Sequence, residues 1–291
     1  MPAVIAVTGA SGRIGGRVAR RLTERGAATR LLGRDPARLP SIPGSSVAPP
    51  AAYGDSAAMR RACDGTGTLF LVSARESRDR VQAQLTAVDA AVSAGVERIV
   101  YVSFLGAGPG ATFTFARDHW HTEEYIRATG VRHTFLRDSF YLAALAAMAG
   151  ADGVIRGPGG EGRVSAVAHD DIADAAVGVL LADDGAHDGV TYELTGPEAL
   201  SLSEAAAELS RFAGREVTYV AETREEAYAS RAGYGAEEWE VTGWVTSYEA
   251  IAAGEMSTVT DAVPKLAERP ATSFTEFLRE NPESYRHLRP L

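Results

Sequence analysis

Cysteine and long apolar stretches are both scarce in this sequence. The single cysteine, Cys63, excludes an intramolecular disulfide framework and a multi-cysteine metal site, and it favours a reducing compartment. No apolar stretch has membrane-spanning length, and no basic segment with an apolar signal core precedes the first predicted strand. We therefore predict a cytoplasmic protein without membrane insertion.

Positive charge is also low relative to negative charge. Lysine and arginine total 29 against 38 aspartates and glutamates, so the formal net charge is -9 and the pI is near 5.3. Affinity for nucleic acids comes largely from clustered basic side chains that release counterions. A nucleic-acid partner is therefore not expected.

Short apolar runs alternate with amphipathic segments through the first half of the chain. This alternation is typical of a parallel sheet covered by helices on both faces. The expected strands are 3–8, 28–33, 46–52, 67–73, 98–103 and 132–137, and helices are expected at 14–25, 78–94 and 117–129. The prediction is an α/β Rossmann fold with a doubly wound parallel sheet, which binds ligands at the carboxyl ends of its strands.

The rhythm changes after Arg137, and mainly helical segments follow. We predict an NAD(P)-binding Rossmann domain at 1–138 with returning segments at about 164–195, and a smaller substrate-binding lobe at 139–163 and 196–291. His169, Asp170 and Asp171 invite a metal-site reading. Three adjacent side chains at a strand-to-helix corner cannot all converge on one ion, so we interpret Asp170 or Asp171 as a helix cap and predict no metal.

A glycine-rich turn links the first predicted strand to the first predicted helix. Its sequence is Gly9-Ala10-Ser11-Gly12-Arg13-Ile14-Gly15. Gly9 permits a tight turn, Gly12 lets backbone amides approach a pyrophosphate, and Gly15 lets the helix pack closely on the strand. A lone glycine triplet is weak evidence, but the strand before it and the helix after it favour a dinucleotide site. We predict that this turn holds NAD(P)H.

The end of the second predicted strand distinguishes the two nicotinamide cofactors. Arg34 is placed to contact a 2′-phosphate, and Arg13 could join it. Asp35 could instead take the ribose, but an aspartate directly before a proline is a natural helix N-cap. We therefore favour NADPH over NADH. Asp55 is either an adenine-side contact or the cap of a helix at 56–62.

With these motifs in place, the chain resembles the NmrA-like atypical short-chain dehydrogenases, and most closely the type 2 NAD(P)H:quinone oxidoreductases. The resemblance covers nearly the whole chain and rests on TGASGRIG, GRDPARL, YGDSAAM, GTLFLVSA, AGVERIVYVS, HTEEYIRATGVRHTFLRDSFY, GRVSAVAHDDIADAA and YELTGPEALSLSEAA. It implies a Rossmann fold and a nicotinamide cofactor. It constrains the substrate less, because members of this family share the scaffold without sharing a reaction.

The general acid is the open question of the predicted chemistry. Short-chain dehydrogenases with Tyr-x-x-x-Lys use the lysine to lower the tyrosine pKa, but the one lysine here, Lys265, follows no tyrosine at that spacing. In many NmrA-like reductases a lysine precedes a glutamate by four residues, and the matching positions here are His119 and Glu123. His119 is thus a candidate to donate a proton, with an ordinary pKa of about 6.5, or to bind the nicotinamide ribose. The alternative is a histidine on the surface of a helix.

Residues that follow the predicted strands complete the candidate site. Ser73 and Ser103 are expected beside the nicotinamide, and Tyr141 is the second catalytic candidate. Aromatic side chains suit a flat apolar acceptor, although Phe104 could be core packing. The substrate candidates are Phe104, Phe140, Tyr141 and Trp244.

These expectations predict an NADPH-dependent reductase that transfers hydride from the nicotinamide to a quinone or a similar small carbonyl acceptor. Two alternatives stay open: a non-catalytic NADP(H)-sensing regulator of the NmrA type, and a ketone or imine reductase of a secondary pathway. The sequence leaves the oligomeric state open, a homodimer included.

Overall fold

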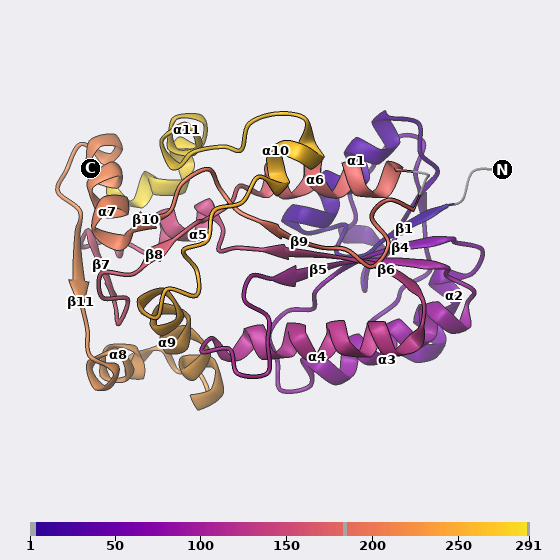
Figure 1. Ribbon diagram of the computed structural model, residues 1–291, viewed down its shortest axis with the longest axis horizontal. Helices are drawn as coiled ribbons and strands as arrows, with labels where there is room; N and C mark the ends of the chain where they lie inside the picture. Colours follow the sequence, from indigo (N-terminus) through magenta and orange to yellow (C-terminus); the bar gives the residue numbers. More distant parts are fainter. Residues whose placement is uncertain (1–3, 183–184, 290–291) are drawn as a thin grey trace.

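A seven-stranded parallel sheet forms the centre of the computed structural model, which describes residues 4–182 and 185–289 (Figure 1). Its strand order is β3-β2-β1-β4-β5-β6-β9, so the order reverses beside β1, as in a doubly wound sheet. The strands are β1 (Ile5–Val7), β2 (Thr29–Leu31), β3 (Ser46–Val47), β4 (Thr68–Val72), β5 (Arg98–Phe104), β6 (Arg132–Asp138) and β9 (Thr191–Leu194). The predicted fold class is confirmed.

The third strand is shorter than the predicted 46–52. It ends at Val47, two residues before Pro49 and Pro50, which have no backbone N–H to donate to a neighbouring strand. The helix expected from residue 117 begins earlier, at Thr114.

Helices cover both faces of the sheet (Figure 1). One face carries α1 (Arg13–Glu24), α6 (His169–Leu181) and α10 (Ala262–Ala267), and the other carries α2 (Ser56–Cys63), α3 (Arg80–Ser93) and α4 (Thr114–Thr129). The apolar positions that predicted α1, Ile14, Val18 and Leu22, are all buried. Cys63 is buried at the end of α2, and burial raises the pKa of its thiol to about 11, as expected of a packing residue.

Charge pairs fasten α6 to the elements beside it. Asp170 binds Arg17 and Arg21 of α1, and Asp171 accepts hydrogen bonds from the backbone N–H and the hydroxyl of Thr272. The N-cap of α6 is Ala168, so the prediction that Asp170 or Asp171 caps this helix is wrong. Both carboxylates lie within the first turn, where they complement the positive end of the helix dipole.

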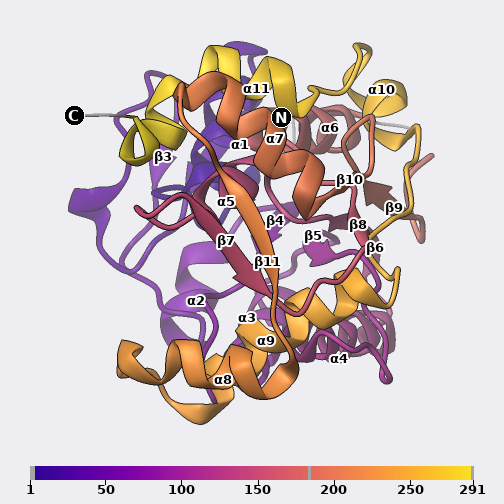
Figure 2. The same ribbon diagram turned by 90° about the vertical axis from the view of Figure 1, so that its left-hand side faces the viewer.

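The remaining elements form a smaller lobe beyond the carboxyl ends of the strands (Figure 2). They are α5 (Leu142–Ala147), β7 (Val154–Gly157), β8 (Arg163–Val164), β10 (Leu200–Ser201), α7 (Leu202–Ala213), β11 (Thr218–Ala221), α8 (Arg224–Arg231), α9 (Glu238–Ala252) and α11 (Phe274–Glu280), with 3-10 turns at Ala232–Tyr234 and Pro282–Leu288. A further 3-10 turn, Pro36–Arg38, belongs to the sheet domain. One apolar cluster runs from Phe104 and Leu105 at the end of β5 to Leu202 and Leu209 of α7. The lobe therefore packs directly onto the edge of the sheet where ligands are expected.

No helix in the described part of the chain is long and apolar enough to cross a membrane.

Candidate functional site

The glycine-rich turn adopts the geometry that its sequence predicts. Gly9 has a φ of +59°, a conformation that side chains disfavour, and its carbonyl accepts a hydrogen bond from Gly12. A Cβ atom on Gly15 would lie 2.4 Å from the Gly9 carbonyl oxygen, so only a glycine lets α1 pack this closely. Gly12 is the N-cap of α1 and provides no side-chain cap, which leaves backbone N–H groups of the first turn available to an anion.

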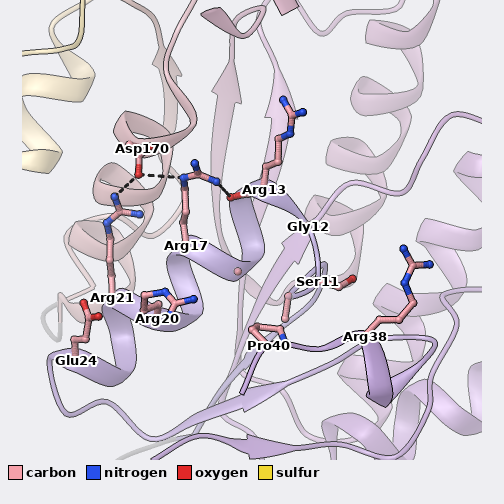
Figure 3. Close-up of a pocket in the computed structure, with 12 residues that line it drawn as sticks. Ser11, Gly12, Arg13, Arg17, Arg20, Arg21, Glu24, Arg38, Pro40 and Asp170 are labelled. Carbon is pink, nitrogen blue, oxygen red and sulfur yellow. Dashed lines mark hydrogen bonds and ion pairs between the residues drawn. The ribbon is translucent and has the colours of Figure 1, made fainter. Parts of the chain in front are cut away.

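A cavity of about 590 Å³ opens beside this turn (Figure 3). We call it the arginine cavity, and its lining residues are Ala10, Ser11, Gly12, Arg13, Gly16, Arg17, Arg20, Arg21, Glu24, Arg38, Pro40 and Asp170. Arg17 and Arg21 point toward Asp170, at 3.0 and 2.6 Å. The side chains of Arg13, Arg20 and Arg38 have no interaction with the other residues drawn in Figure 3. The cavity thus has spare positive charge in a chain of net charge -9.

Arg38, rather than the predicted Arg34, lines the arginine cavity. Arg34 is exposed at the start of the loop after β2. Asp35 accepts a hydrogen bond from the Ala37 N–H at 3.0 Å and begins the 3-10 turn Pro36–Arg38, so its predicted role as a cap is confirmed. This turn carries Arg38 to the glycine-rich turn. The sequence predicts the start of this turn, because an N-cap followed by proline is typical of a helix N-terminus, but it does not predict that the turn ends at Arg38.

Asp55 caps the helix that follows β3. Its carboxylate accepts a hydrogen bond from the Ala58 N–H at 2.9 Å at the start of α2. The cap interpretation is confirmed, and contact with an adenine stays a prediction.

His119 lies inside the protein, so the surface-histidine alternative is wrong. The side chain is 6% exposed, and its Nε2 accepts a hydrogen bond from Arg80 Nη2 at 2.9 Å. Because a guanidinium can only donate, Nε2 carries no proton and the ring proton sits on Nδ1, 3.0 Å from the Tyr101 hydroxyl. Burial, then the charges of Arg80 and Arg137, hold the pKa of His119 well below 6.5. Its pKa therefore differs from the ordinary histidine value, and its role as proton donor or ribose ligand stays a prediction.

Ser103 is fully buried, and its hydroxyl is engaged by structural partners. It donates to Glu123 Oε1 at 2.6 Å, and Arg137 donates to both oxygens of the same carboxylate at 2.8 and 2.6 Å. These bonds turn the Ser103 hydroxyl toward α4. Ser73 follows β4 at the same edge of the sheet and is partly buried.

A second cavity, of about 300 Å³, lies between the strand ends and α9. We call it the aromatic cavity, and its lining residues are Arg75, Glu76, Phe113, Phe115, Phe140, Glu240, Gly243, Trp244 and Ser247. Two of the predicted substrate residues, Phe140 and Trp244, come together here from distant parts of the chain. Phe104 is 9% exposed and packs behind them, with its ring 5.2 Å from that of Phe140.

Phe113 and Phe115 belong to the aromatic cavity, although sequence reasoning did not select them. Phe113 is the N-cap of α4 and Phe115 lies in its first turn, with their ring centroids 5.5 Å apart. A Cβ atom on Gly243 of α9 would lie 2.3 Å from the Phe115 ring. Glycine at 243 therefore allows α9 to press against the cavity wall.

Tyr141 turns away from its neighbour Phe140. Phe140 packs against the cluster of Phe104 and Phe113, whereas Tyr141 packs against the cluster that contains Ala10 of the glycine-rich turn. The Tyr141 hydroxyl donates to Asp138 Oδ2 at 3.0 Å. Two adjacent residues thus face the two sides of the site.

Asp138 and His169 flank Tyr141, and sequence reasoning gave neither a role in binding or catalysis. Asp138 is 2% exposed, and burial raises its pKa to about 8 against the opposing effects of Tyr141 and Arg80. The His169 ring lies 4.3 Å from that of Tyr141, and burial, then Arg13 and Arg17, lower its pKa to about 4. In residues 4–182 and 185–289 no three side chains of His, Cys, Asp and Glu form a group that could hold a metal ion.

Comparisons with known proteins agree on one family. The model of the NmrA-like family matches residues 1–278. An NAD(P)H azoreductase of Xenophilus azovorans is 33% identical over 97% of this chain and 99% of that protein. Quinone oxidoreductase 2 of Escherichia coli is 33% identical over 74% of this chain and 77% of that protein. The crystal structure of the Escherichia coli NADPH-dependent quinone oxidoreductase QOR2 with NADPH superposes with a TM-score of 0.85 at 29% identity, covering 95% of this chain and 99% of that one.

Proposed function

Because the chain belongs to the NmrA-like family, we propose that it is an NADPH-dependent reductase that transfers hydride to a quinone or a similar small acceptor. Relatives named as an azoreductase and a quinone oxidoreductase support this function. One observation carries the proposal: Phe140 lines the aromatic cavity, while the next residue, Tyr141, packs against the apolar cluster to which Ala10 of the glycine-rich turn belongs. A cofactor on that turn and an acceptor in that cavity would meet at this pair.

The arginine cavity fits the phosphates of a dinucleotide. Gly12 and the first-turn amides of α1 would hold the pyrophosphate, because no side chain caps them. Arg38 with Arg13 would bind the 2′-phosphate, and Arg34 is the second candidate for that contact. When bound, the reduced nicotinamide supplies the hydride.

The aromatic cavity fits a flat, apolar acceptor. Phe113, Phe140 and Trp244 offer ring faces and edges for stacking. Of its charged members, Arg75 can donate a hydrogen bond to the carbonyl or azo end of such a molecule, whereas Glu76 and Glu240 can accept from its N–H or O–H groups. Stacking tolerates different ring systems, so we expect several quinones to be accepted.

His119 is a positioning residue in this scheme. Its unprotonated Nε2 holds Arg80, whose Nε donates to the Ala74 carbonyl at 2.9 Å. Arg80 is 3% exposed and brings a buried positive charge near Asp138 and Tyr141. Burial raises the pKa of both groups, and this charge offsets part of that rise. Binding of the nicotinamide ribose by His119 stays a prediction.

Steady-state oxidation of NADPH tests the proposed function. The assay follows NADPH absorbance with a panel of quinones, azo dyes, aldehydes and ketones, and repeats each reaction with NADH. We expect quinone-dependent oxidation with a preference for NADPH. Failure of every acceptor to oxidise bound NADPH would refute the proposal and would favour a dinucleotide-binding regulator.

A further inference from the structure

Asp138 is a buried carboxyl group to which neither cavity gives a role. It is the last residue of β6 and pairs with Phe104 of β5 and Leu194 of β9 at the carboxyl edge of the sheet. Its side chain accepts from the Tyr141 hydroxyl at 3.0 Å. The pair therefore lies at the carboxyl edge of the sheet, directly beside Phe140 of the aromatic cavity.

Glu123, a second buried carboxylate near Asp138, provides a comparison because its charge is paired with a cation. Glu123 is as buried as Asp138, but Arg137 donates two hydrogen bonds to it and neutralises its charge. Asp138 has a neutral hydroxyl, that of Tyr141, in the place of such a cation. A buried carboxyl without a paired cation is held in its protonated form.

We propose that Asp138 and Tyr141 form the proton-donating pair of the reduction, with Tyr141 facing the reduced acceptor and Asp138 resupplying Tyr141 from the buried side. This inference rests on the proposed function. The general acid is then the pair at the end of β6 and in the turn that follows it. His119 has no part in proton transfer and accepts the hydrogen bond that holds Arg80.

The proton and electron balance closes without a further reactant. The acceptor gains a hydride, which is one proton and two electrons, and then bears one negative charge. The Tyr141 O–H bond breaks as an O–H or N–H bond forms on the acceptor, and the Asp138 proton passes to the Tyr141 oxygen. Water returns a proton to the Asp138 carboxylate before the next turnover.

Charged groups on the surrounding elements act on this pair in opposite directions. Burial raises the pKa of both members, and the charges of Asp138 and of Glu76, which precedes α3 and lines the aromatic cavity, raise that of Tyr141 further. Arg80 of α3 lowers both pKa values but does not cancel the rise. The ring of His169 of α6 lies tilted against that of Tyr141, and His169 stays neutral above about pH 4. The pKa of Asp138, about 8, therefore sets the pH range of the test.

Asp138→Asn and Tyr141→Phe test the pair with little change in shape. We expect the wild-type kcat/KM to fall as pH rises through about 8, because the protonated carboxyl is then lost. For an azo dye or an aldehyde, whose reduced anion is strongly basic, each variant should be about 100-fold slower or more and should lack this fall. For a quinone, whose hydroquinone anion takes a proton from water, we expect a loss below about tenfold.

A second Tyr–Asp pair provides matched controls. The Tyr125 hydroxyl donates to Asp89 at 2.7 Å across the exposed side of α4 and α3, away from both cavities. Tyr125→Phe and Asp89→Asn should leave the rate and its pH dependence unchanged. Thermal unfolding of all four variants checks that each is folded.

Infrared spectroscopy of the protein without cofactor gives a readout independent of activity. A protonated carboxyl band present at about pH 7 and absent in Asp138→Asn supports the proposal. An ionised Asp138 at that pH overturns it. If both Asp138→Asn and Tyr141→Phe keep the reductase activity and its pH dependence, the proton-donating pair is refuted and the proposed function stands. If no acceptor oxidises NADPH, the pair and the proposed function are both refuted.

Discussion

The arginine cavity and the aromatic cavity lie at the same end of the sheet domain and differ in almost every chemical respect. The first surrounds the N-terminus of α1 with five arginines, of which Arg17 and Arg21 are occupied by Asp170. The second is walled by Phe113, Phe115, Phe140 and Trp244. Charge and fixed backbone amides suit one invariant anionic ligand, whereas ring stacking suits a class of flat molecules.

This difference explains how one scaffold can keep its cofactor and vary its acceptor. The arginine cavity depends on glycines whose replacement meets backbone atoms, so it tolerates little change. The aromatic cavity depends on side chains from a loop and from α9, which can be exchanged without altering the sheet. The predictions below separate the two cavities, beginning with the largest expected effect.

Gly12→Val and Gly15→Ala should fail in different ways. Valine at 12 meets a single close atom, the Gly9 carbonyl oxygen at 3.1 Å from its Cβ, so the protein should fold but lose NADPH binding. Alanine at 15 would place its Cβ 2.4 Å from the same oxygen, and should cost about 2 kcal/mol of unfolding free energy or more. Thermal unfolding with and without NADPH measures both effects. A normal NADPH-induced shift in Gly12→Val would place the dinucleotide elsewhere.

Arg38→Ala should weaken NADPH binding about 10- to 100-fold and leave NADH binding nearly unchanged. A charge-assisted contact contributes about 1.5–3 kcal/mol, and NADH lacks the phosphate that makes it. Arg34→Ala is the matched variant, since Arg34 is exposed and does not line the cavity. Titration of both variants with both cofactors decides between them. A larger loss in Arg34→Ala, or equal losses for NADPH and NADH, would contradict the assignment of Arg38.

Trp244→Ala should raise KM for quinones by about 2- to 10-fold and leave KM for NADPH unchanged. The range corresponds to one lost aromatic contact of about 0.5–1.5 kcal/mol. Trp120→Ala is the control, because Trp120 makes an edge-to-face contact with His121 and does not line the cavity. If the two variants behaved alike, the aromatic cavity would not be the acceptor site.

His119→Gln should show the smallest effect, on acid stability. His119 is neutral when folded, and the unfolded chain takes up its proton below about pH 6.5, so this histidine destabilises the fold as pH falls below that value. The variant should lose less stability between about pH 6.5 and pH 5 than the wild type. His121 is exposed on the same helix, so His121→Gln is the control. Denaturant titrations at several pH values compare the free energies of unfolding of the wild type and the two variants. An identical acid loss in all three proteins would contradict a neutral, buried His119.

The sequence predicts more of the arginine cavity than of the aromatic cavity. The glycine-rich turn and the Asp35 cap are local features, and their residues act within a few positions of one another. The aromatic cavity joins residues 113–115, 140 and 244, whose meeting depends on how α9 packs over the strand ends. The protonation state of His119 was the least accessible from the sequence, because it depends first on burial and then on Arg80, 39 positions away along the chain.

Mixing the preformed protein–NADPH complex with a quinone in a stopped-flow instrument tests the central claim most directly. The account predicts that one equivalent of bound NADPH is oxidised at a rate that depends on quinone concentration, and that Trp244→Ala needs more quinone to reach the same rate. A complex that binds NADPH and keeps it reduced in the presence of every quinone would contradict the account.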